Sequence, residues 1–471
     1  MSNLLNKKMA RFNYLIGSAN LKFNKYQYKG VEWCVKNELN SGSDIRGGFV
    51  ADEMGLGKTL LMIGTMFVNM LPRTLIVVPP VLILQWSNEI YKVSGHHATM
   101  YYGHVKKNMS LDHLNKSRIV LTTYHTLLSK KCIVQNVVWD RVIFDEAHHL
   151  RNSRTQRFHI CKQINAKIRW LVTGTPIQNK KKDFYDLCSI AGLSPSVYKD
   201  YKNIVEKYVL RRTKLQVGID LPPVIKTNCI VDWQNIKEMK LSEKLHSLIP
   251  KQSGVSLINK TQLAKVFGDG GVLVAMIRAK QSCIMPSLMR KTFEENGLYH
   301  YLEALDYTSK LDAVIELMLE RKDNGKGKIV FCHYRNEIDA IVSRLLKGGL
   351  KKVISYDGRN SGGEQLKNLA EPADALVIQI QTGCEGLNLQ ANFSEIYFVS
   401  PDWNPCVEDQ AIARCHRIGQ TNVVNVFKFE MRGFKKQSDL SDTLDPVTLE
   451  TYVNKIQDIK RAICEEILNG N

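Results

Sequence analysis

The chain has no run of apolar residues long enough to cross a membrane. Its longest apolar stretch, residues 74–86, is interrupted by Pro79 and Pro80, whereas a membrane-spanning helix needs about 20 consecutive apolar residues. The segment from Met1 to Arg11 is polar and basic, which is not the pattern of a secretory signal peptide. We therefore expect an intracellular protein that does not enter the membrane.

Closely spaced cysteine pairs are also missing. The 11 cysteines are scattered, and no two of them stand in a C-x-x-C arrangement. This spacing argues against a zinc finger or a RING module, and an intracellular chain keeps its thiols reduced. We expect no structural zinc.

Acidic residues are fewer than basic ones. The 46 Asp and Glu residues stand against 65 Lys and Arg residues, which gives a net charge of +19. Such an excess favours a polyanionic partner, of which nucleic acid is the commonest, although solubility alone would also account for it. The apolar share of 44% is that of an ordinary globular protein, and 471 residues suffice for two or three domains.

Short apolar, β-branched runs alternate with helical patterns in two separate stretches of the chain. This alternation is typical of parallel sheets wound by helices. The first set of predicted strands comprises residues 48–51, 74–78, 119–122, 142–144 and 169–173. The second set comprises residues 328–332, 352–356, 375–379, 395–399 and 423–429. The sequence thus predicts an α/β protein with two parallel-sheet domains and a mostly helical, polar region between them.

A phosphate-binding loop follows the first predicted strand. Residues 52–59 read D-E-M-G-L-G-K-T and precede an apolar helical pattern. Gly55 and Gly57 allow backbone N–H groups to face a phosphate at the start of a helix. Lys58 can reach the β- and γ-phosphates of a nucleotide, and Thr59 can bind magnesium. The loop departs from the G-x-x-x-x-G-K-[ST] pattern because Asp52 stands where the first glycine belongs.

Two carboxylates follow another predicted strand. Residues 142–148 read V-I-F-D-E-A-H. Asp145 can hold the magnesium of a bound nucleotide, and Glu146 can orient and deprotonate the attacking water. Alone, such a pair is usually a solvated loop, but together with the phosphate loop it predicts a nucleoside triphosphatase.

These motifs and their order resemble helicase superfamily two, and their spellings are similar to those of the SWI/SNF-type DNA translocase ATPases. The resemblance covers nearly the whole chain and implies two RecA-like lobes in tandem with a helical inter-lobe insertion. The implied boundaries are 1–213 for the ATP-binding lobe, 214–307 for the helical region and 308–471 for the C-terminal helicase lobe. ATP and Mg²⁺ are the implied cofactors, and Gln27, which precedes the phosphate loop, is implied to read the adenine.

The resemblance also implies contacts with the phosphate backbone of double-stranded DNA. Short hydroxyl and amide groups at strand ends suit such contacts, which position the DNA without reading its bases. Each of these segments could instead simply pack against its own sheet. The implied contact residues are Gln85, Trp86, Thr122, Thr123, Lys180 and Lys181 in the first lobe, and Thr382, Asn388 and Trp403 in the second.

The second lobe carries the most specific match to the family. Residues 382–390 read T-G-C-E-G-L-N-L-Q, and residues 408–420 read E-D-Q-A-I-A-R-C-H-R-I-G-Q. The resemblance implies that Gly386 and Gln410 contact the nucleotide. Arg414 and Arg417 are spaced i, i+3, so we expect both on one face of a helix, directed at the γ-phosphate. An arginine placed there stabilises the charge on the transferred phosphoryl group.

One segment departs from the family. After the glycine that corresponds to Gly358, the family usually continues with a small polar turn and then an arginine on a helix. Here residues 359–366 read R-N-S-G-G-E-Q-L and have no arginine at that later place. The departure concerns an inter-lobe or DNA contact and not the nucleotide site.

The sequence therefore predicts an ATPase that moves along duplex DNA, located in the nucleus or, for a virus, in the virion or a cytoplasmic replication site. Its substrate could also be a protein–DNA complex. One alternative is a strand-separating DNA or RNA helicase with the same ATPase core. A second alternative is a non-catalytic DNA-binding scaffold, although every residue that the chemistry needs is present.

Overall fold

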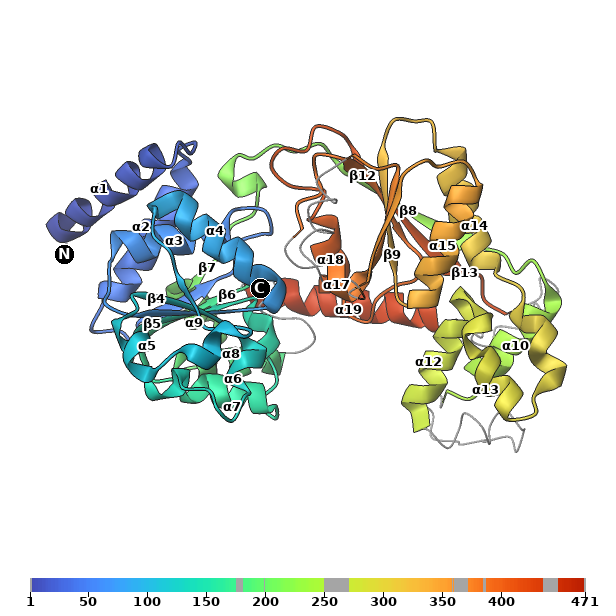
Figure 1. The fold of residues 1–471 in the computed structure, drawn as a ribbon, viewed down its shortest axis with the longest axis horizontal. Coiled ribbons are helices and arrows are strands. Elements are labelled where there is room, and N and C mark those ends of the chain that lie inside the picture. Colours follow the sequence, from blue (N-terminus) through green and yellow to red (C-terminus); the bar gives the residue numbers. More distant parts are fainter. Residues whose placement is uncertain are drawn as a thin grey trace. The chain divides into compact units, whose positions relative to one another are not determined.

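Parallel β-strands build two sheets, one in each of two units of the chain (Figure 1). The first unit comprises Met1–Asp220 and Lys460–Asn471, and the second comprises Leu221–Ile459. The computed structural model describes residues 2–174, 181–198, 200–249, 271–357, 359, 372–383, 387–434 and 448–469. Of residues 2, 3, 382, 383 and 464–469 it describes the backbone alone. The expected α/β class with two parallel-sheet lobes is confirmed.

The sheet of the first unit has seven strands in the order β3-β4-β2-β5-β6-β1-β7. Side chains alternate between its two faces, as the twofold period of a strand requires. In β2, Leu75 and Val77 belong to one apolar core, and Ile76 and Val78 belong to the other. The strands are β1 (Gly47–Val50), β2 (Thr74–Val78), β3 (Thr99–Met100), β4 (Ile119–Thr123), β5 (Trp139–Asp145), β6 (Ala166–Val172) and β7 (Val209–Leu210).

Helices cover both faces of this sheet. One core is closed by α1 (Ser2–Ser18), α2 (Lys25–Leu39), α3 (Lys58–Val68) and α4 (Ile83–Ser94). The other core is closed by α5 (Leu111–Lys116), α6 (Tyr124–Leu127), α7 (Gln156–Gln163), α8 (Lys181–Ala191) and α9 (Tyr201–Tyr208). In Figure 1 the first group lies above the sheet and α5 to α8 lie below it. The carboxyl edge of the sheet is thereby left to the connecting loops.

The sheet of the second unit has six strands in the order β10-β11-β9-β12-β13-β8. Every strand pair in both sheets, within the residues that the structure describes, is parallel. Strand β8 falls inside the region expected to be mostly helical, and the sequence pattern does not predict it. The strands are β8 (Val224–Val231), β9 (Gly327–Cys332), β10 (Val353–Tyr356), β11 (Ala375–Gln379), β12 (Phe393–Phe398) and β13 (Val424–Met431).

Helices also cover both faces of the second sheet, and a further group has a small core of its own. One face is covered by α14 (Ser309–Glu320) and α15 (Arg335–Lys347), and the other by α18 (Pro405–Ile412) and the neighbouring short helix α17 (Ile380–Gly383). Helix α10 (Ile236–His246), α13 (Arg290–Glu295) and residues 298–305 enclose the separate core. Two further α-helices of the described residues are α12 (Gly271–Ile284) and α19 (Leu449–Asn469), of which α19 is divided between the two units.

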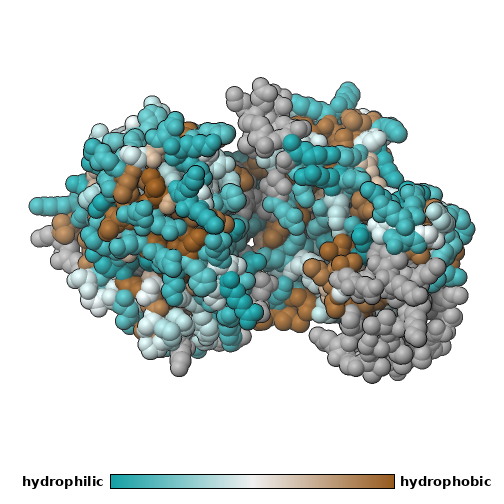
Figure 2. All heavy atoms as spheres, turned by 60° about the horizontal axis from the view of Figure 1, so that its bottom comes forward, coloured by the Kyte–Doolittle hydropathy of each residue, from teal (hydrophilic) through white to brown (hydrophobic). Residues whose placement is uncertain are grey.

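None of the helices in the described part of the chain combines the length and apolar character needed to cross a bilayer. On the face drawn in Figure 2, hydrophilic residues predominate among those described, and apolar residues gather in separate patches.

Candidate active site

The candidate site lies at the carboxyl edge of the first sheet, where β5, β6 and β1 are neighbours. The phosphate loop follows β1, Asp145 ends β5, and Thr173 follows β6. Parallel strands end at the same edge of a sheet, so these residues converge although they are far apart in sequence. A Cβ atom on Gly174 would lie 3.3 Å from Lys58 Nζ, which places the end of β6 directly against the loop.

The phosphate loop has the backbone conformation that its glycines permit. Gly55 has φ of 90° and Gly57 has φ of 77°, a left-handed region that glycine enters without steric cost. Helix α3 begins directly after Gly57, so its N-terminal N–H groups and positive dipole end face the loop. Lys58 is the first residue of α3, and its Nζ donates to the carbonyl oxygen of Asp52 at 2.9 Å.

Gln27, for which the family resemblance implies a role in reading the adenine, lies against this loop. It is buried on α2, and a Cβ atom on Gly57 would lie only 2.6 Å from its Nε2. Asn24 Nδ2 lies 3.5 Å from Gln27 Oε1 on the other side. The amide is therefore held beside the loop, and a side chain at position 57 would displace it.

Asp145 is buried and accepts two hydrogen bonds. Trp86 Nε1 donates to its Oδ2 at 2.7 Å, and the backbone N–H of Glu146 donates to its Oδ1 at 3.0 Å. Burial, and then the charge of Glu146, raise the pKa of Asp145 to about 7, against the opposing effects of the two hydrogen bonds and of Lys58. A carboxyl with this pKa is ready to gain or lose a proton near neutral pH.

Glu146 occupies a strained backbone position. Its φ of 49° lies in the left-handed region, which costs a residue other than glycine about 1–3 kcal/mol. Its Oε2 lies 3.2 Å from Nδ1 of His148, and the same nitrogen lies 3.4 Å from Thr173 Oγ1. Glu146, His148 and Thr173 thus form a polar row beside the loop, suited to orienting a water molecule.

The donor set fits a magnesium ion that is shared with a nucleotide. In the described part of the chain, no group of three or more His, Cys, Asp and Glu side chains could hold a metal ion by itself. Mg²⁺ is usually held by one or two protein oxygens, substrate phosphates and water. The carboxylate of Asp145 and the hydroxyl of Thr59 are oxygen donors of this kind.

Three of the expected DNA contacts in the first unit are wrong. The side chains of Trp86, Thr122 and Thr123 are fully buried. Trp86 donates to Asp145, Thr122 Oγ1 donates to the carbonyl oxygen of Tyr101 at 2.9 Å, and Thr123 Oγ1 caps α6. These groups are used inside the lobe because they point into its cores, so they cannot reach a DNA backbone.

The other candidates in the first unit stay predictions. Gln85 is half-buried at the start of α4, and its buried Oε1 has no hydrogen-bond partner among the described residues. Lys181 is exposed at the start of α8, with its Nζ 5.9 Å from the centre of the Tyr201 ring. Lys180 and the preceding residues 175–179 lie outside the described residues.

The helix expected to carry both arginines of the second unit is shorter than predicted. Helix α18 ends at Ile412, and residues 413–419 form turns. Arg414 and Arg417 are half-buried within these turns and do not share a helix face. Gln420 explains the turn, because its Nε2 donates to the carbonyl oxygens of Phe393 (3.1 Å) and Cys415 (3.2 Å).

The turns bring Arg417 to Asn388, another residue singled out by its sequence motif. Nη1 of Arg417 donates to Asn388 Oδ1. Burial, and then the charge of Arg414, lower the pKa of Arg417.

Gln410 is buried on α18, and Trp403, which precedes that helix, is 37% exposed. Only the backbone of Thr382 is described, and Gly358 and Gly386 lie outside the described residues.

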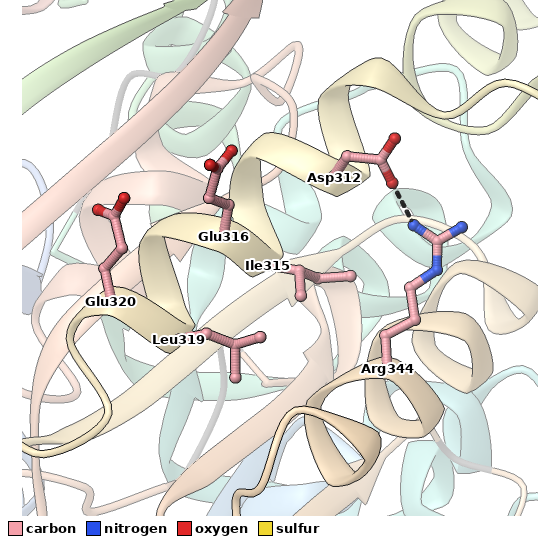
Figure 3. A pocket seen from close by; sticks show the side chains of 6 residues that line it. All are labelled: Asp312, Ile315, Glu316, Leu319, Glu320 and Arg344. Carbon is pink, nitrogen blue, oxygen red and sulfur yellow. Dashed lines mark hydrogen bonds and ion pairs between the residues drawn. The ribbon is translucent and has the colours of Figure 1, made fainter.

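The second unit also carries an open groove between α14 and α15, with a volume of about 490 Å³. Figure 3 shows three carboxylates spaced along α14, above the apolar side chains of Ile315 and Leu319. Arg344 Nη1 on α15 pairs with one of them, Asp312 Oδ1, at 2.5 Å. Since Glu316 and Glu320 would repel phosphate groups, this groove is not a nucleotide site.

Two family models match the chain in succession. The SNF2-related domain matches residues 26–203, which contain the phosphate loop and Asp145, and the helicase conserved C-terminal domain matches residues 309–419, which contain the two arginines. The chain belongs to the SWI/SNF-type ATPases of helicase superfamily two. Members of this family are ATP-dependent, helicase-like hydrolases, and the expected enzyme class is confirmed.

Relatives of this SWI/SNF-type ATPase come from bacteria, viruses and animals. It is 27% identical to a probable global transactivator of Orgyia pseudotsugata multicapsid polyhedrosis virus, over 86% of this chain and 85% of the viral protein. It is 26% identical to an uncharacterized ATP-dependent helicase of Mycoplasma genitalium, over 94% of this chain and 42% of that protein. It is 26% identical to human chromodomain-helicase-DNA-binding protein 1, over 94% of this chain and 27% of the human protein. The chain thus spans less than half the length of the last two.

Sequence reasoning missed the partners that hold the site residues in place. Trp86 fixes Asp145 from a distance of 59 residues, and His148 lies against Glu146. Trp86 was singled out only by the resemblance of its segment to the family, which does not distinguish a DNA contact from an internal hydrogen bond.

Proposed function

We propose that the protein is an ATP-dependent translocase or remodeller of double-stranded DNA, which hydrolyses ATP with residues of both units. The observation that carries this proposal is that the phosphate loop after β1 and the pair Asp145 and Glu146 at the end of β5 lie at the same edge of one sheet, close enough for Lys58 to act on the charge of Asp145. Family membership supports the nucleic-acid dependence, and the net charge of +19 supports a polyanionic partner.

Each residue of the first unit has a proposed role that follows from its place. Lys58 binds the β- and γ-phosphates, while Thr59 and Asp145 hold the magnesium ion that neutralises them. Glu146 accepts the proton of the attacking water, and Gln27 reads the edge of the adenine. The loop glycines Gly55 and Gly57 let the backbone approach the phosphates.

The second unit supplies positive charge for the transition state and contacts to DNA. We propose Arg414 and Arg417 for the γ-phosphate and Gln410 for the nucleotide, so that hydrolysis depends on residues of the second unit as well as the first. The remaining candidates for phosphate contacts along DNA are Gln85, Lys180, Lys181, Thr382, Asn388 and Trp403. The similarity to human chromodomain-helicase-DNA-binding protein 1 and to a probable global transactivator of a virus supports a place on DNA in the nucleus or at a site of viral replication.

A phosphate-release assay tests this function. ATP turnover is measured with duplex DNA, single-stranded DNA, RNA or no nucleic acid, and we expect duplex DNA to stimulate it most. Lys58→Ala should lower the stimulated rate by about 10²-fold or more, since one fixed charge at the transferred group is worth that much. Equal stimulation by single-stranded DNA or RNA would favour a strand-separating helicase, and absence of turnover would favour a scaffold.

A further inference from the structure

Arg212 joins the two parts of the candidate nucleotide site. It lies just after β7, and its Nε donates to Asp52 Oδ1 at 3.0 Å while its Nη2 pairs with Asp52 Oδ2. Its Nη1 donates to the carbonyl oxygen of Tyr26, and the guanidinium lies 5.5 Å from the centre of the Tyr26 ring. One side chain therefore binds the first residue of the phosphate loop and the residue directly before Gln27.

The backbone around Arg212 is fixed along the same loop. Ala51 N–H donates to the carbonyl oxygen of Leu210 at 2.8 Å, and Glu53 N–H donates to that of Arg212 at 2.9 Å. Lys214 N–H donates to Glu53 Oε2 at 2.8 Å, and its Nζ lies 3.0 Å from Glu53 Oε1. The segment 210–214 thus extends the sheet past β7 and sets where the guanidinium stands.

Gly30 provides the space that the guanidinium occupies. A Cβ atom at this position of α2 would lie 2.8 Å from Nη2 and 3.0 Å from Nη1 of Arg212, and 2.7 Å from Leu61 Cδ1. A larger residue would push α2, and with it Gln27, away from the loop. The glycine is therefore required by close approach and not by its φ angle.

These contacts also explain why Asp52 replaces the first glycine of the phosphate-loop pattern. Its carboxylate is fully buried beside the guanidinium, and a buried charge needs such a partner. Its carbonyl oxygen accepts from Lys58 Nζ at 2.9 Å. Asp52 thus connects Arg212 to the lysine that faces the phosphates, while Tyr26 connects Arg212 to Gln27.

We propose that Arg212 is a positioning residue that sets Gln27 at a fixed place beside the phosphate loop, and that the preference for adenine nucleotides depends on it. This inference rests on the proposed function, in which Gln27 reads the base. A planar guanidinium serves three acceptors at once in a fixed geometry, whereas an ammonium acts as a compact charge. Lysine at this position keeps the charge beside Asp52 but cannot hold Tyr26 and both carboxylate oxygens together.

The test compares turnover of ATP and GTP in single and double variants of the full chain. Arg212→Lys should raise KM for ATP by about tenfold, as expected when one charged hydrogen bond is lost, and change kcat much less. The ratio of kcat/KM for ATP over GTP should fall by a similar factor. Gln27→Ala should lower this ratio too, and the double variant should show no further loss, because Arg212 acts through Gln27.

Arg169→Lys is the matched control. Arg169 lies in the same unit and donates to the backbone carbonyl oxygens of Ile190 (3.2 Å) and Lys162 (3.3 Å). Its substitution should lower the melting temperature and leave the ATP-to-GTP ratio unchanged. If Arg212→Lys does not fold, Asp52→Asn keeps the shape of the partner, removes its charge and should lower the ratio in the same direction.

The outcomes separate this inference from the proposed function. An unchanged ATP-to-GTP ratio in Arg212→Lys or in Asp52→Asn, with only a lower melting temperature, would overturn the positioning role. An unchanged ATP-to-GTP ratio in Gln27→Ala, with Lys58→Ala inactive, would also overturn the positioning role. The protein would then hydrolyse ATP at this site without Gln27 reading the base. Full turnover in Lys58→Ala would instead overturn the proposed function itself.

Discussion

At the scale of single residues, Asp145 shows how the fold prepares a carboxyl for a metal ion. Burial disfavours its charged form, and the hydrogen bonds from Trp86 and from the N–H of Glu146, together with the charge of Lys58, oppose that effect only in part. A divalent cation bound beside it would favour the ionised form again. The proton on this carboxyl is therefore a sensitive reporter of magnesium binding.

We predict that binding of Mg²⁺ and nucleotide releases a proton near pH 6–7, since the pKa of Asp145 is raised to about 7. Because the pKa of Asp145 in the folded protein lies above its unfolded value, the protonated carboxyl adds to the stability of the fold below about pH 4, and this contribution is lost as pH rises to about 7. The proton also competes with Mg²⁺ for the carboxylate, so nucleotide affinity should weaken as pH falls from 8 to 6. Calorimetry in two buffers of different ionisation enthalpy measures the released proton.

Asp145→Asn is the control that tests whether the released proton comes from this carboxyl. It should abolish the release and flatten the pH dependence of affinity. Proton release that persists unchanged in the variant would assign the titration to another group.

Glu146 combines a strained backbone with a carboxylate held near His148. We predict that Glu146→Gln keeps ATP and magnesium binding, since the amide has the same shape, but lowers kcat by about 10²–10⁴-fold, the usual contribution of a general base. Equilibrium binding of a fluorescent nucleotide and single-turnover hydrolysis measure the two effects. A loss of affinity with little change in kcat would make Glu146 a binding residue.

At the scale of helices and strands, the pattern of apolar residues predicts the sheets well. Strands 74–78 and 375–379 are confirmed at the same residues as β2 and β11, because buried parallel strands are continuous β-branched runs. Strand β8 is missed because it is an edge strand with polar, exposed residues such as Lys226 and Asn228. Its place depends on pairing with β13, which lies some 200 residues further along the chain.

The site could be predicted only as far as it is local in sequence. The phosphate loop and the Asp145–Glu146 pair are contiguous motifs, so their residues were identified without the fold. The roles of Trp86 and Thr122 could not be inferred because a buried donor and an exposed one look alike in a sequence. The end of α18 at Ile412 was missed because Gln420, eight residues further on, donates to the carbonyl oxygens of Phe393 and Cys415, contacts that the sequence does not show.

Helix α4 contributes to the site through one hydrogen bond, and Trp86→Phe removes that bond while keeping an aromatic ring. We predict that the pKa of Asp145 rises further, so that the apparent Kd for Mg²⁺ with nucleotide at pH 7 increases by about tenfold. The pH profile of binding should shift upward accordingly. Titration of the variant with Mg²⁺ at several pH values checks this.

Trp139→Phe is the matched control for Trp86→Phe. Trp139 is also fully buried, and its Nε1 donates to the carbonyl oxygen of Val134 at 3.1 Å, away from Asp145. It should lower stability to a similar extent without moving the pH profile. Identical profiles for both variants would show that Trp86 matters only for packing.

At the scale of the whole molecule, the proposed reaction needs both units. We predict that Arg417→Ala lowers kcat by about 10³-fold, the usual scale for an arginine that stabilises the transferred phosphoryl group. Nucleotide affinity should stay close to wild type, because the phosphate loop and Asp145 belong to the first unit. Arg432→Ala, at an exposed arginine paired with Asp232 in the second unit, is the control. Equal losses in both variants would point to a general effect on stability.

The whole molecule also bears on whether the protein separates the two strands of a DNA duplex. Strand separation needs an element that inserts between the strands, and opening each base-pair step costs about 1.4 kcal/mol of stacking on average. Every strand pair in the residues that the structure describes is parallel, so this part of the chain has no β-hairpin that could serve as a wedge. We predict ATP-dependent displacement of a third strand from the major groove of a duplex, with little unwinding of a forked duplex. Both assays are run at one protein and ATP concentration with Lys58→Ala as the inactive control, and robust fork unwinding would make the strand-separating helicase the correct description.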